Sequence, residues 1–227
     1  MPRHESGPPQ TDETADQIVL AALFLLLTRQ NQQLRHEVSH DDLTGLLTKK
    51  ALIEKGNQRL SRARPDQAYA LAFFDLDNFK AINDKHPDKY DEGDRTLKTA
   101  AEVLFQNVRH EGESADILAH GNREDTDAAR LGGDEFAGLF ELTARREQGA
   151  AMSEEERAAA FCGRIYTDFK AAFANRPDID ALGGIDLSIV TIIRQPGEMM
   201  EAMLSRGAVA MGEVKRLHHT ENGSYRS

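Results

Sequence analysis

The sequence predicts an α/β sandwich, in which helices flank a sheet, and three observations support this fold class. A continuous apolar run, Tyr69–Phe74, has the length and composition of a buried strand. Two further strand-like runs, 128–131 and 136–140, are joined through Gly132-Gly133, which is typical of a hairpin because glycine reaches positive φ without steric cost. Segments with helical spacing lie around them in the order helix, strand, helices, hairpin, helix, strand, helix.

The composition fits one medium-sized domain with extensions. The chain has 227 residues, of which 40% are hydrophobic and 29% are charged, as is ordinary for a globular protein. Its 28 basic and 38 acidic residues give a net charge of −10, which argues against nucleic acid as a partner because non-specific binding requires a basic face. Cys162 is the single cysteine, so no disulfide framework or cysteine-rich zinc site is expected, and a cytoplasmic location is the default.

The N-terminal part predicts a tail followed by one helix. Residues 1–14 are rich in proline, glycine and charge and are expected to be disordered, and the helix covers 15–38. Its apolar run Ile18–Leu27 is too short for a bilayer span, which needs about 20 residues, so no membrane span is expected. A heptad pattern with Asn31 at an a position favours a parallel dimer. The alternative is a helix that packs on its own domain, and both interpretations stay open.

The main domain is predicted over 39–217. Asp41 or Asp42 is a candidate N-cap for a first helix that runs to about Ala63. After the strand at 69–74, the pattern predicts a short helix at 79–83, a loop at 86–93 and a helix at 94–108. The long polar segment 109–127 is expected to be functional or disordered. The last elements are a helix at 153–174, a turn at Gly183-Gly184, a strand at 185–193, a helix from 197 to about 217 and a polar tail at 218–227.

Carboxylates gather at the ends of two predicted strands. Asp134 and Glu135 are adjacent at the tight end of the hairpin, where a hard cation such as Mg²⁺ would offset their repulsion. A solvated turn is the alternative, because aspartate and glycine are common in turns. The strand Tyr69–Phe74 ends in Asp75-Leu76-Asp77, which is how α/β domains deliver carboxylates to a site. We therefore expect Asp75 and Asp134 to meet there and hold a metal.

Taken together, these stretches resemble the diguanylate cyclase family, which is named for its GGDEF signature. The signature is intact at Gly132–Phe136. Asp42–Lys50 is similar to the family's opening D-x-LTGL-x-N-R-R, Phe74–Asp84 to its D-x-D-x-FK-x-x-ND, and Glu92–Asp94 to its later G-D. Together the motifs are far more specific than a lone GGDEF. The resemblance implies a palm-like, antiparallel-centred sheet flanked by helices, with the signature on a β-hairpin.

The resemblance also implies a reaction that joins two GTP molecules into cyclic di-GMP and releases two pyrophosphates. Each 3′-hydroxyl attacks the α-phosphate of the other nucleotide across a homodimer, with Mg²⁺ or Mn²⁺ as the cofactor. The implied metal ligands are Asp75, the backbone carbonyl of Leu76, Asp134 and Glu135. The implied catalytic residues are Glu135 and Asp134.

Substrate binding is implied for six residues: Asn83, Asp94, Asn78, Phe79, Lys80 and Lys215. Asn83 and Asp94 would recognise the base, and a carboxylate suits guanine because it accepts from both the ring N–H and the exocyclic amine. The other four would hold the phosphates. From the residues alone, Asn83 also fits a helix end, Lys80 a surface lysine and Lys215 a partner of the helix dipole.

Some positions depart from the family pattern. The loop before Gly93-Asp94 is longer and lacks the family's Gly-His, which can shift Asp94 relative to Asn83, and the last helix is altered. The family's inhibitory R-x-x-D has Arg123 in register but no aspartate three residues later. Arg130 remains, to pair with product or with the hairpin. We therefore expect a solvated, charged loop around 123–127 rather than a working inhibitory site.

The combined interpretation is a cytoplasmic, homodimeric diguanylate cyclase that uses GTP and has a possible regulatory protein partner. One alternative is a degenerate domain that binds GTP or a protein without turnover, which the altered last helix favours and the intact Asp75, Asp134 and Glu135 oppose. Another alternative is a cyclase that makes a different cyclic dinucleotide.

Overall fold

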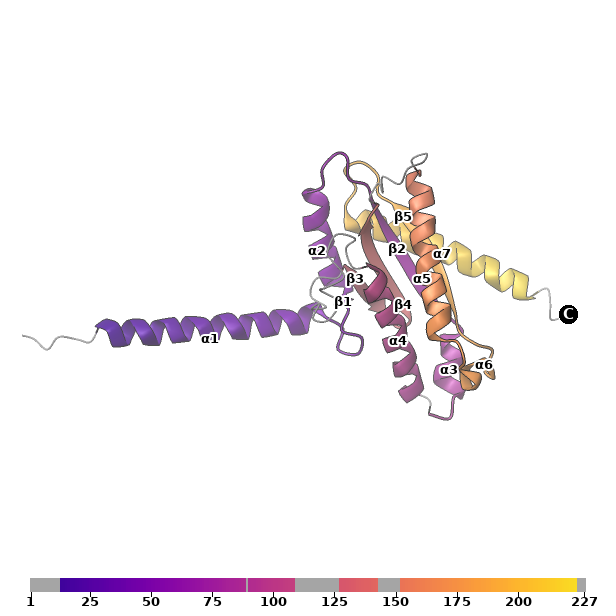
Figure 1. Cartoon of the computed structure of the whole chain (residues 1–227), viewed down its shortest axis with the longest axis horizontal. Helices are drawn as coiled ribbons and strands as arrows, with labels where there is room; N and C mark the ends of the chain where they lie inside the picture. Colours follow the sequence, from indigo (N-terminus) through magenta and orange to yellow (C-terminus); the bar gives the residue numbers. More distant parts are fainter. Residues whose placement is uncertain (1–12, 89, 109–126, 143–151, 224–227) are drawn as a thin grey trace, which may run out of the picture. The chain divides into compact units, whose positions relative to one another are not determined.

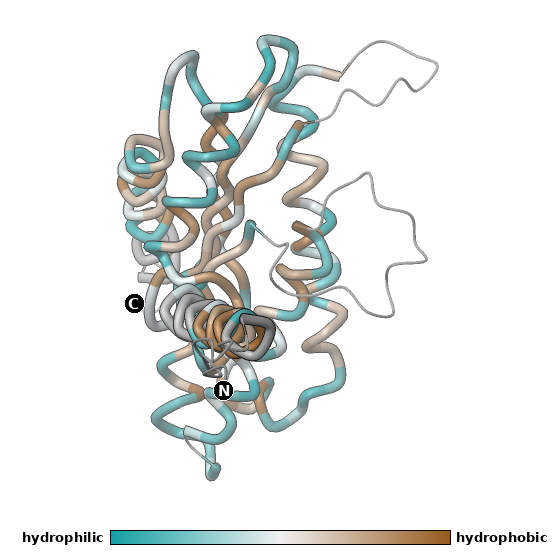
Figure 2. The backbone as a smooth tube through the Cα atoms, turned by 90° about the vertical axis from the view of Figure 1, so that its left-hand side faces the viewer, coloured by the Kyte–Doolittle hydropathy of each residue, from teal (hydrophilic) through white to brown (hydrophobic). Residues whose placement is uncertain are grey.

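The computed structural model describes residues 13–88, 90–108, 127–142 and 152–223 (Figure 1). The chain divides into two compact units, Met1–Val38 and Ser39–Ser227. In the first unit, the helix α1 (Glu13–Ser39) carries eight large apolar side chains that are exposed: Ile18, Val19, Leu20, Leu23, Phe24, Leu25, Leu26 and Leu27. Figure 2 colours part of this helix as hydrophobic. Among the described residues, no helix has both the length and the hydropathy that crossing a bilayer requires.

The second unit is built on one five-stranded sheet in the order β1-β3-β4-β2-β5. Its strands are β1 (Leu47–Thr48), β2 (Tyr69–Asp77), β3 (Ala128–Gly132), β4 (Glu135–Glu141) and β5 (Asp186–Ile193). β1 runs parallel to β3, and the other neighbours are antiparallel. The predicted α/β class with an antiparallel-centred sheet is therefore confirmed, as is the hairpin, whose strands are β3 and β4.

Helices cover both faces of this sheet. The helices α4 (Tyr90–Val108) and α5 (Glu154–Ala172) lie in front of it in Figure 1, and α7 (Met200–Gly223) lies behind it with α2 (Lys49–Ser61) beside α7. Two short helices, α3 (Phe79–Lys85) and α6 (Pro177–Asp180), lie near one end of the sheet. Figure 2 colours the central strands as mainly hydrophobic and the outer turns as hydrophilic.

The central strand β2 is buried on both faces, and its alternation assigns each side chain to one layer. Phe74 and Leu76 join the core under α4 and α5, whereas Leu71 and Phe73 join the core under α2 and α7. Because the side-chain period of a strand is two, Asp75 points to the same face as Phe73, which is the face that α7 covers.

The first helix of the domain starts later than predicted. It begins at Lys49 with Thr48 as its N-cap, whose hydroxyl accepts from the amide of Ala51 at 3.3 Å. The prediction of an N-cap at Asp41 or Asp42 is therefore wrong. Asp41 instead closes a turn, because its Oδ1 accepts from the backbone N–H and the hydroxyl of Thr44 at 2.9 and 2.7 Å. Gly45 follows at φ +68°, a conformation that ends any helical run.

Two other boundaries differ from the predicted ones. The helix α4 begins at Tyr90, so residues 90–93 are helical rather than part of a loop. The helix α7 continues to Gly223, beyond the predicted end near 217. The elements β1 and α6 were not predicted, because runs of two and four residues are too short for a periodic pattern to indicate.

Asp127 corrects the prediction of a solvated, charged loop at its position. It is fully buried just before β3, where it forms ion pairs with Arg59 and, at 3.7 Å, with Lys55, both from α2. Its backbone carbonyl accepts from the amide of Leu139 at 3.0 Å. Arg123 and the rest of 109–126 lie outside the described residues.

Two glycines of α7 are expected to respond in opposite ways to replacement by alanine. A Cβ at Gly207 would overlap the ring of Phe73 on β2, whereas a Cβ at Gly212 would meet no atom within 4 Å. We expect Gly207→Ala to destabilise the fold by about 2 kcal/mol through overpacking. Gly212→Ala should stabilise it by up to about 1 kcal/mol, the gain in helix propensity. Urea unfolding of both variants checks this, and equal shifts would contradict the close packing of α7 on β2.

Candidate functional site

The site lies where the end of β2 meets the β3–β4 hairpin. Asp75 is 3% exposed and pairs with Glu135 in the antiparallel register of β2 and β4. The amide of Leu76 donates to the carbonyl of Asp134 at 3.3 Å, which ties the end of β2 to the hairpin turn. Opposite residues of paired strands share a face, so Glu135 projects to the same side as Asp75. The predicted meeting of Asp75 with the signature carboxylates therefore has a structural basis in this register.

The hairpin turn is held by glycine geometry and by Arg130. Gly133 has φ +52°, in the left-handed region that favours glycine. The guanidinium of Arg130 donates to the carbonyl of Gly133 through Nε at 2.9 Å and Nη2 at 2.7 Å, and its Nη1 lies 3.3 Å from both oxygens of Asp41. Burial would raise the pKa of Asp41, but bonds from Thr44 and the charge of Arg130 hold it below its usual value. Arg130 thus pairs with the hairpin.

Lys215 reaches into the site from α7. Its Nζ donates to Oδ2 of Asp75 at 2.5 Å. Burial would lower the pKa of Lys215, but the bond to Asp75 and the negative charges of Asp75, Asp134 and Glu135 outweigh it and raise this pKa. For Asp75, burial is the main effect and raises the pKa, Asp134 and Asp77 add to it, and the bond from Lys215 opposes it. The buried carboxylate of Asp75, which lies near other carboxylates, is therefore already paired with the ammonium group of Lys215.

These residues fit a divalent metal. The donors gathered here are carboxylate and carbonyl oxygens, which are the ligands that Mg²⁺ and Mn²⁺ prefer. The ammonium group of Lys215 at 2.5 Å from Asp75 shows that the site accepts positive charge. Asp134 is half-buried and Glu135 is exposed, so both are open to a ligand from solvent.

The turn after β2 combines one structural residue with two residues that are more open. Asn78 adopts φ +68°, and its side-chain amide donates to the carbonyls of Leu182 at 3.2 Å and Gly184 at 2.7 Å. Its side chain therefore anchors the turn before β5, which leaves its backbone for any phosphate contact. Phe79 is half-buried against the core under α4 and α5, and Lys80 is exposed.

The structure brings Asn83 and Asp94 to the same place. A Cβ on Gly93 would lie 2.5 Å from Oδ1 of Asn83, so the Asn83 amide packs directly on the backbone of α4 next to Asp94. Only glycine permits this approach. Asn83 is half-buried, and Asp94 is exposed in the first turns of α4. With the longer loop between α3 and α4, Asn83 therefore still packs against the residue directly before Asp94.

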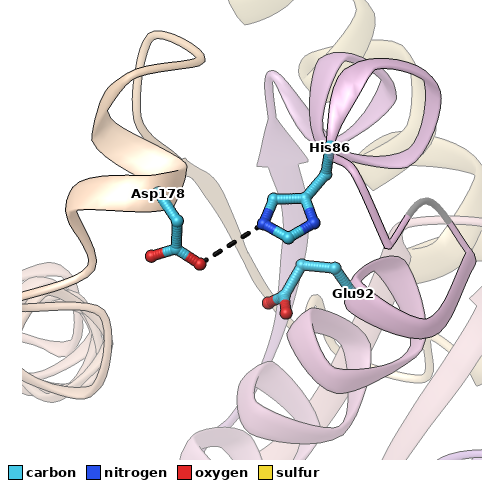
Figure 3. Close-up of side chains that lie close together, drawn as sticks. All are labelled: His86, Glu92 and Asp178. Atoms are coloured by element: carbon cyan, nitrogen blue, oxygen red, sulfur yellow. Dashed lines mark ion pairs between the residues drawn. The ribbon is translucent and has the colours of Figure 1, made fainter.

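A charged cluster next to this pair was not found from the sequence (Figure 3). Glu92 is 1% exposed, and its two oxygens accept from Arg176 at 2.7 Å and from Arg95 at 2.9 Å. Arg176 also donates to Asp178 at 2.6 Å, and Nε2 of His86 lies 3.4 Å from the same carboxylate. In the sequence, the cluster is indicated only by the position of Glu92 directly before Gly93-Asp94. Its partner Arg176 is far away in the sequence, so no local pattern joins the two residues.

Comparisons with known proteins point to one family. The family model described as "Diguanylate cyclase, GGDEF domain" matches residues 38–220. The chain is 37% identical over 137 residues to the bifunctional diguanylate cyclase/cyclic di-GMP phosphodiesterase MucR of Pseudomonas aeruginosa, which is 60% of this chain and 17% of MucR. It is 36% identical over 115 residues to the diguanylate cyclase DgcN of Escherichia coli, which is 50% of this chain and 24% of DgcN. The chain thus spans a quarter or less of either relative.

Among solved structures, the coiled coil and GGDEF domain of DgcB from Caulobacter crescentus, in complex with c-di-GMP, has a similar fold. Its TM-score is 0.65 at 23% identity, covering 91% of this chain and 95% of that one. This likeness shows the fold. Because the family model covers most of the chain and the structure brings the matched motifs together, the chain belongs to the diguanylate cyclase GGDEF domain family.

Proposed function

We propose that this protein is a diguanylate cyclase that condenses two GTP molecules into cyclic di-GMP with release of two pyrophosphates. The observation that carries the proposal is the convergence of Asp75, Asp134 and Glu135 at one strand end, with the cation of Lys215 already bound to Asp75. A purely structural contact between the end of β2 and the hairpin gains nothing from three carboxylates in one place, because they repel one another.

Four groups would hold the metal: Asp75, the carbonyl of Leu76, Asp134 and Glu135. When bound, Mg²⁺ or Mn²⁺ lowers the pKa of the attacking 3′-hydroxyl and neutralises charge on the triphosphate. The exposed carboxylate of Glu135 would accept the hydroxyl proton. Lys215, which lies beside these carboxylates, would turn its ammonium group to the triphosphate. The backbone of 78–80 would bind the phosphates further along the chain.

The reaction needs two active sites that face each other, because each GTP supplies both a nucleophile and an electrophile. We therefore propose that two copies of the chain combine, and that the exposed apolar residues of α1 contribute to pairing or to binding a regulatory protein. We place the protein in the cytoplasm, since GTP is its proposed substrate.

The Asp94 carboxylate is proposed to select guanine. We expect Asp94→Ser to weaken GTP binding by about tenfold, since one hydrogen bond to a charged group is lost, and to leave ATP binding unchanged. Competition binding with the two nucleotides measures this selectivity. Asp91→Ser is the matched control, because Asp91 is an exposed aspartate in the first turn of α4, three residues before Asp94. Unchanged GTP selectivity in Asp94→Ser would contradict the assigned role.

A mass-spectrometric product assay tests the proposed activity. The protein is incubated with Mg²⁺ and GTP, with ATP, or with a mixture of both, and Glu135→Gln serves as the inactive control. Cyclic di-GMP from the wild-type protein alone is the expected result. A mixed or adenine-only product would instead show a cyclase of different base choice. No product at concentrations high enough for dimerisation would favour a GTP-binding or protein-binding module without turnover.

A further inference from the structure

The cluster around Glu92 already contains its own cation. One ligand atom each from His86, Glu92 and Asp178 lie within 4.8 Å of one another, a spacing that fits a metal ion. However, Nη2 of Arg176 lies 2.7 Å from Glu92 and 2.6 Å from Asp178, between the two carboxylates. A metal would have to displace this guanidinium, so the cluster is an arginine-centred network of ion pairs.

The guanidinium of Arg176 is fixed in orientation. Its Nε donates to Oδ1 of Asp178 at 3.0 Å while its Nη2 donates to Oδ2, which makes a bidentate pair at the start of α6. The same Nη2 reaches Glu92 in the first turn of α4. Arg176 therefore ties α6 to α4, although the two helices are separated by α5 and β3–β4 in the sequence.

His86 extends the network to the end of α3. Its Nδ1 accepts from the amide of Asp88 at 3.2 Å, so a neutral ring carries its proton on Nε2, the atom that faces Asp178 at 3.4 Å. Figure 3 shows the His86 ring between Asp178 and Glu92, with the ring directed at Asp178. Since His86 is the C-cap of α3, the network holds both ends of the α3–α4 connection.

This network sets the direction of Asp94. Residues two positions apart on a helix point to nearly opposite sides. When Glu92 is drawn inward to 1% exposure, Asp94 is turned out to solvent. Gly93 between them packs on the Asn83 amide. The position of a single buried carboxylate thus decides how the two residues proposed to read the base face a ligand.

We propose that Arg176 and Glu92 form a positioning pair that holds Asn83 and Asp94 in register for guanine recognition. The inference rests on the proposed function, and it explains how a longer α3–α4 connection can serve the same recognition. Arg176 and Glu92 are positioning residues, because both act through Asn83 and Asp94.

The test measures the affinity for GTP and for inosine triphosphate, which lacks the exocyclic amine, in the presence of Mg²⁺. A Glu135→Gln background prevents turnover during the titration. Arg176→Ala alone leaves Glu92 buried with fewer partners, so the main variant is the double change Glu92→Ala/Arg176→Ala. Arg176→Lys keeps the charge but loses the planar fork. Arg64→Ala, which removes an exposed arginine from its ion pair with Asp66, is the control.

We expect the double variant to melt near the wild-type temperature, to bind GTP about tenfold more weakly and to lose its preference for GTP over inosine triphosphate. In the active protein, which keeps Glu135, the same double variant should raise KM for GTP and leave kcat unchanged. The GTP affinity of Arg176→Lys should lie between that of the double variant and that of the wild type. The affinity of Arg64→Ala should match the wild type.

A folded double variant with an unchanged preference would overturn the positioning role while the proposed function stands. A parent protein that binds GTP and inosine triphosphate equally would overturn both the positioning role and guanine recognition by Asp94. If Arg176→Ala loses the preference and the double variant regains it, the orphaned charge of Glu92 is the cause and the positioning role is overturned.

Discussion

Glu135→Gln should lower cyclic di-GMP formation by about 100- to 10,000-fold, the usual contribution of one positioned acid–base group. The amide keeps the shape of the side chain and removes its negative charge. Glu135 faces the same side of the sheet as Asp75, and its charge acts on Lys215. Because Glu135 is exposed, the core loses nothing, so the melting temperature should stay at the wild-type value. The mass-spectrometric product assay and thermal unfolding measure the two effects.

The control for this variant is Glu141→Gln, at the opposite end of the same strand. Glu141 accepts from Gln67 at 3.1 Å and lies away from the hairpin, so its replacement should leave turnover intact. Wild-type turnover in Glu135→Gln would remove the mechanism, and equal losses in both variants would point to a general effect on β4.

Arg59→Met should destabilise the fold by about 3 kcal/mol, because it leaves a buried carboxylate without its main counter-ion. The Asp127 side chain is 1% exposed, whereas that of Arg59 is 26% exposed. The loss of folding free energy therefore comes from leaving the buried Asp127 carboxylate without its main counter-ion. Methionine keeps most of the apolar stem of the arginine side chain. Lys55 at 3.7 Å compensates only part of the charge. The shift of the urea midpoint at constant m-value measures the loss.

Lys50→Met is the matched control on the same helix. Lys50 pairs with Glu54 at 3.9 Å, but both side chains are more than half exposed, so the change should cost at most about 0.5 kcal/mol. If both variants lose the same small amount, the Arg59–Asp127 pair does not hold α2 to the sheet.

The elements that could be predicted are those whose signal is local. Tyr69–Phe74 is an uninterrupted apolar run, and Gly132-Gly133 requires a turn, so β2 and the β3–β4 hairpin were predicted correctly. The pairing of Asp75 with Glu135 depends on strands that are distant in the sequence. The acids at the two strand ends led us to expect Asp75 and Asp134 to meet, but no local pattern gives the register that sets Asp75 opposite Glu135.

The elements that were missed depend on contacts made by distant residues. Gly93 was predicted to lie in a loop, yet it lies inside α4. A glycine stands there because the Asn83 amide occupies the space that a side chain would fill. Asp127 was expected in a solvated, charged loop and Glu92 in the loop before the predicted helix. Both are buried, because arginines from other elements neutralise them. No local periodicity indicates such a partner.

The position of β2 between β4 and β5 has a consequence for how the chain is made. Both neighbours leave the ribosome after β2, and the last register pair joins Ala70 to Ile193. Until then β2 lacks its second paired strand and the cover of α7 on one of its faces, a state that exposes nascent chains to aggregation. Pairings of such long range also form slowly, because the entropy of closing a long loop is lost before the contacts are made. The carboxylate site is therefore assembled only after β5 and α7 have been synthesised.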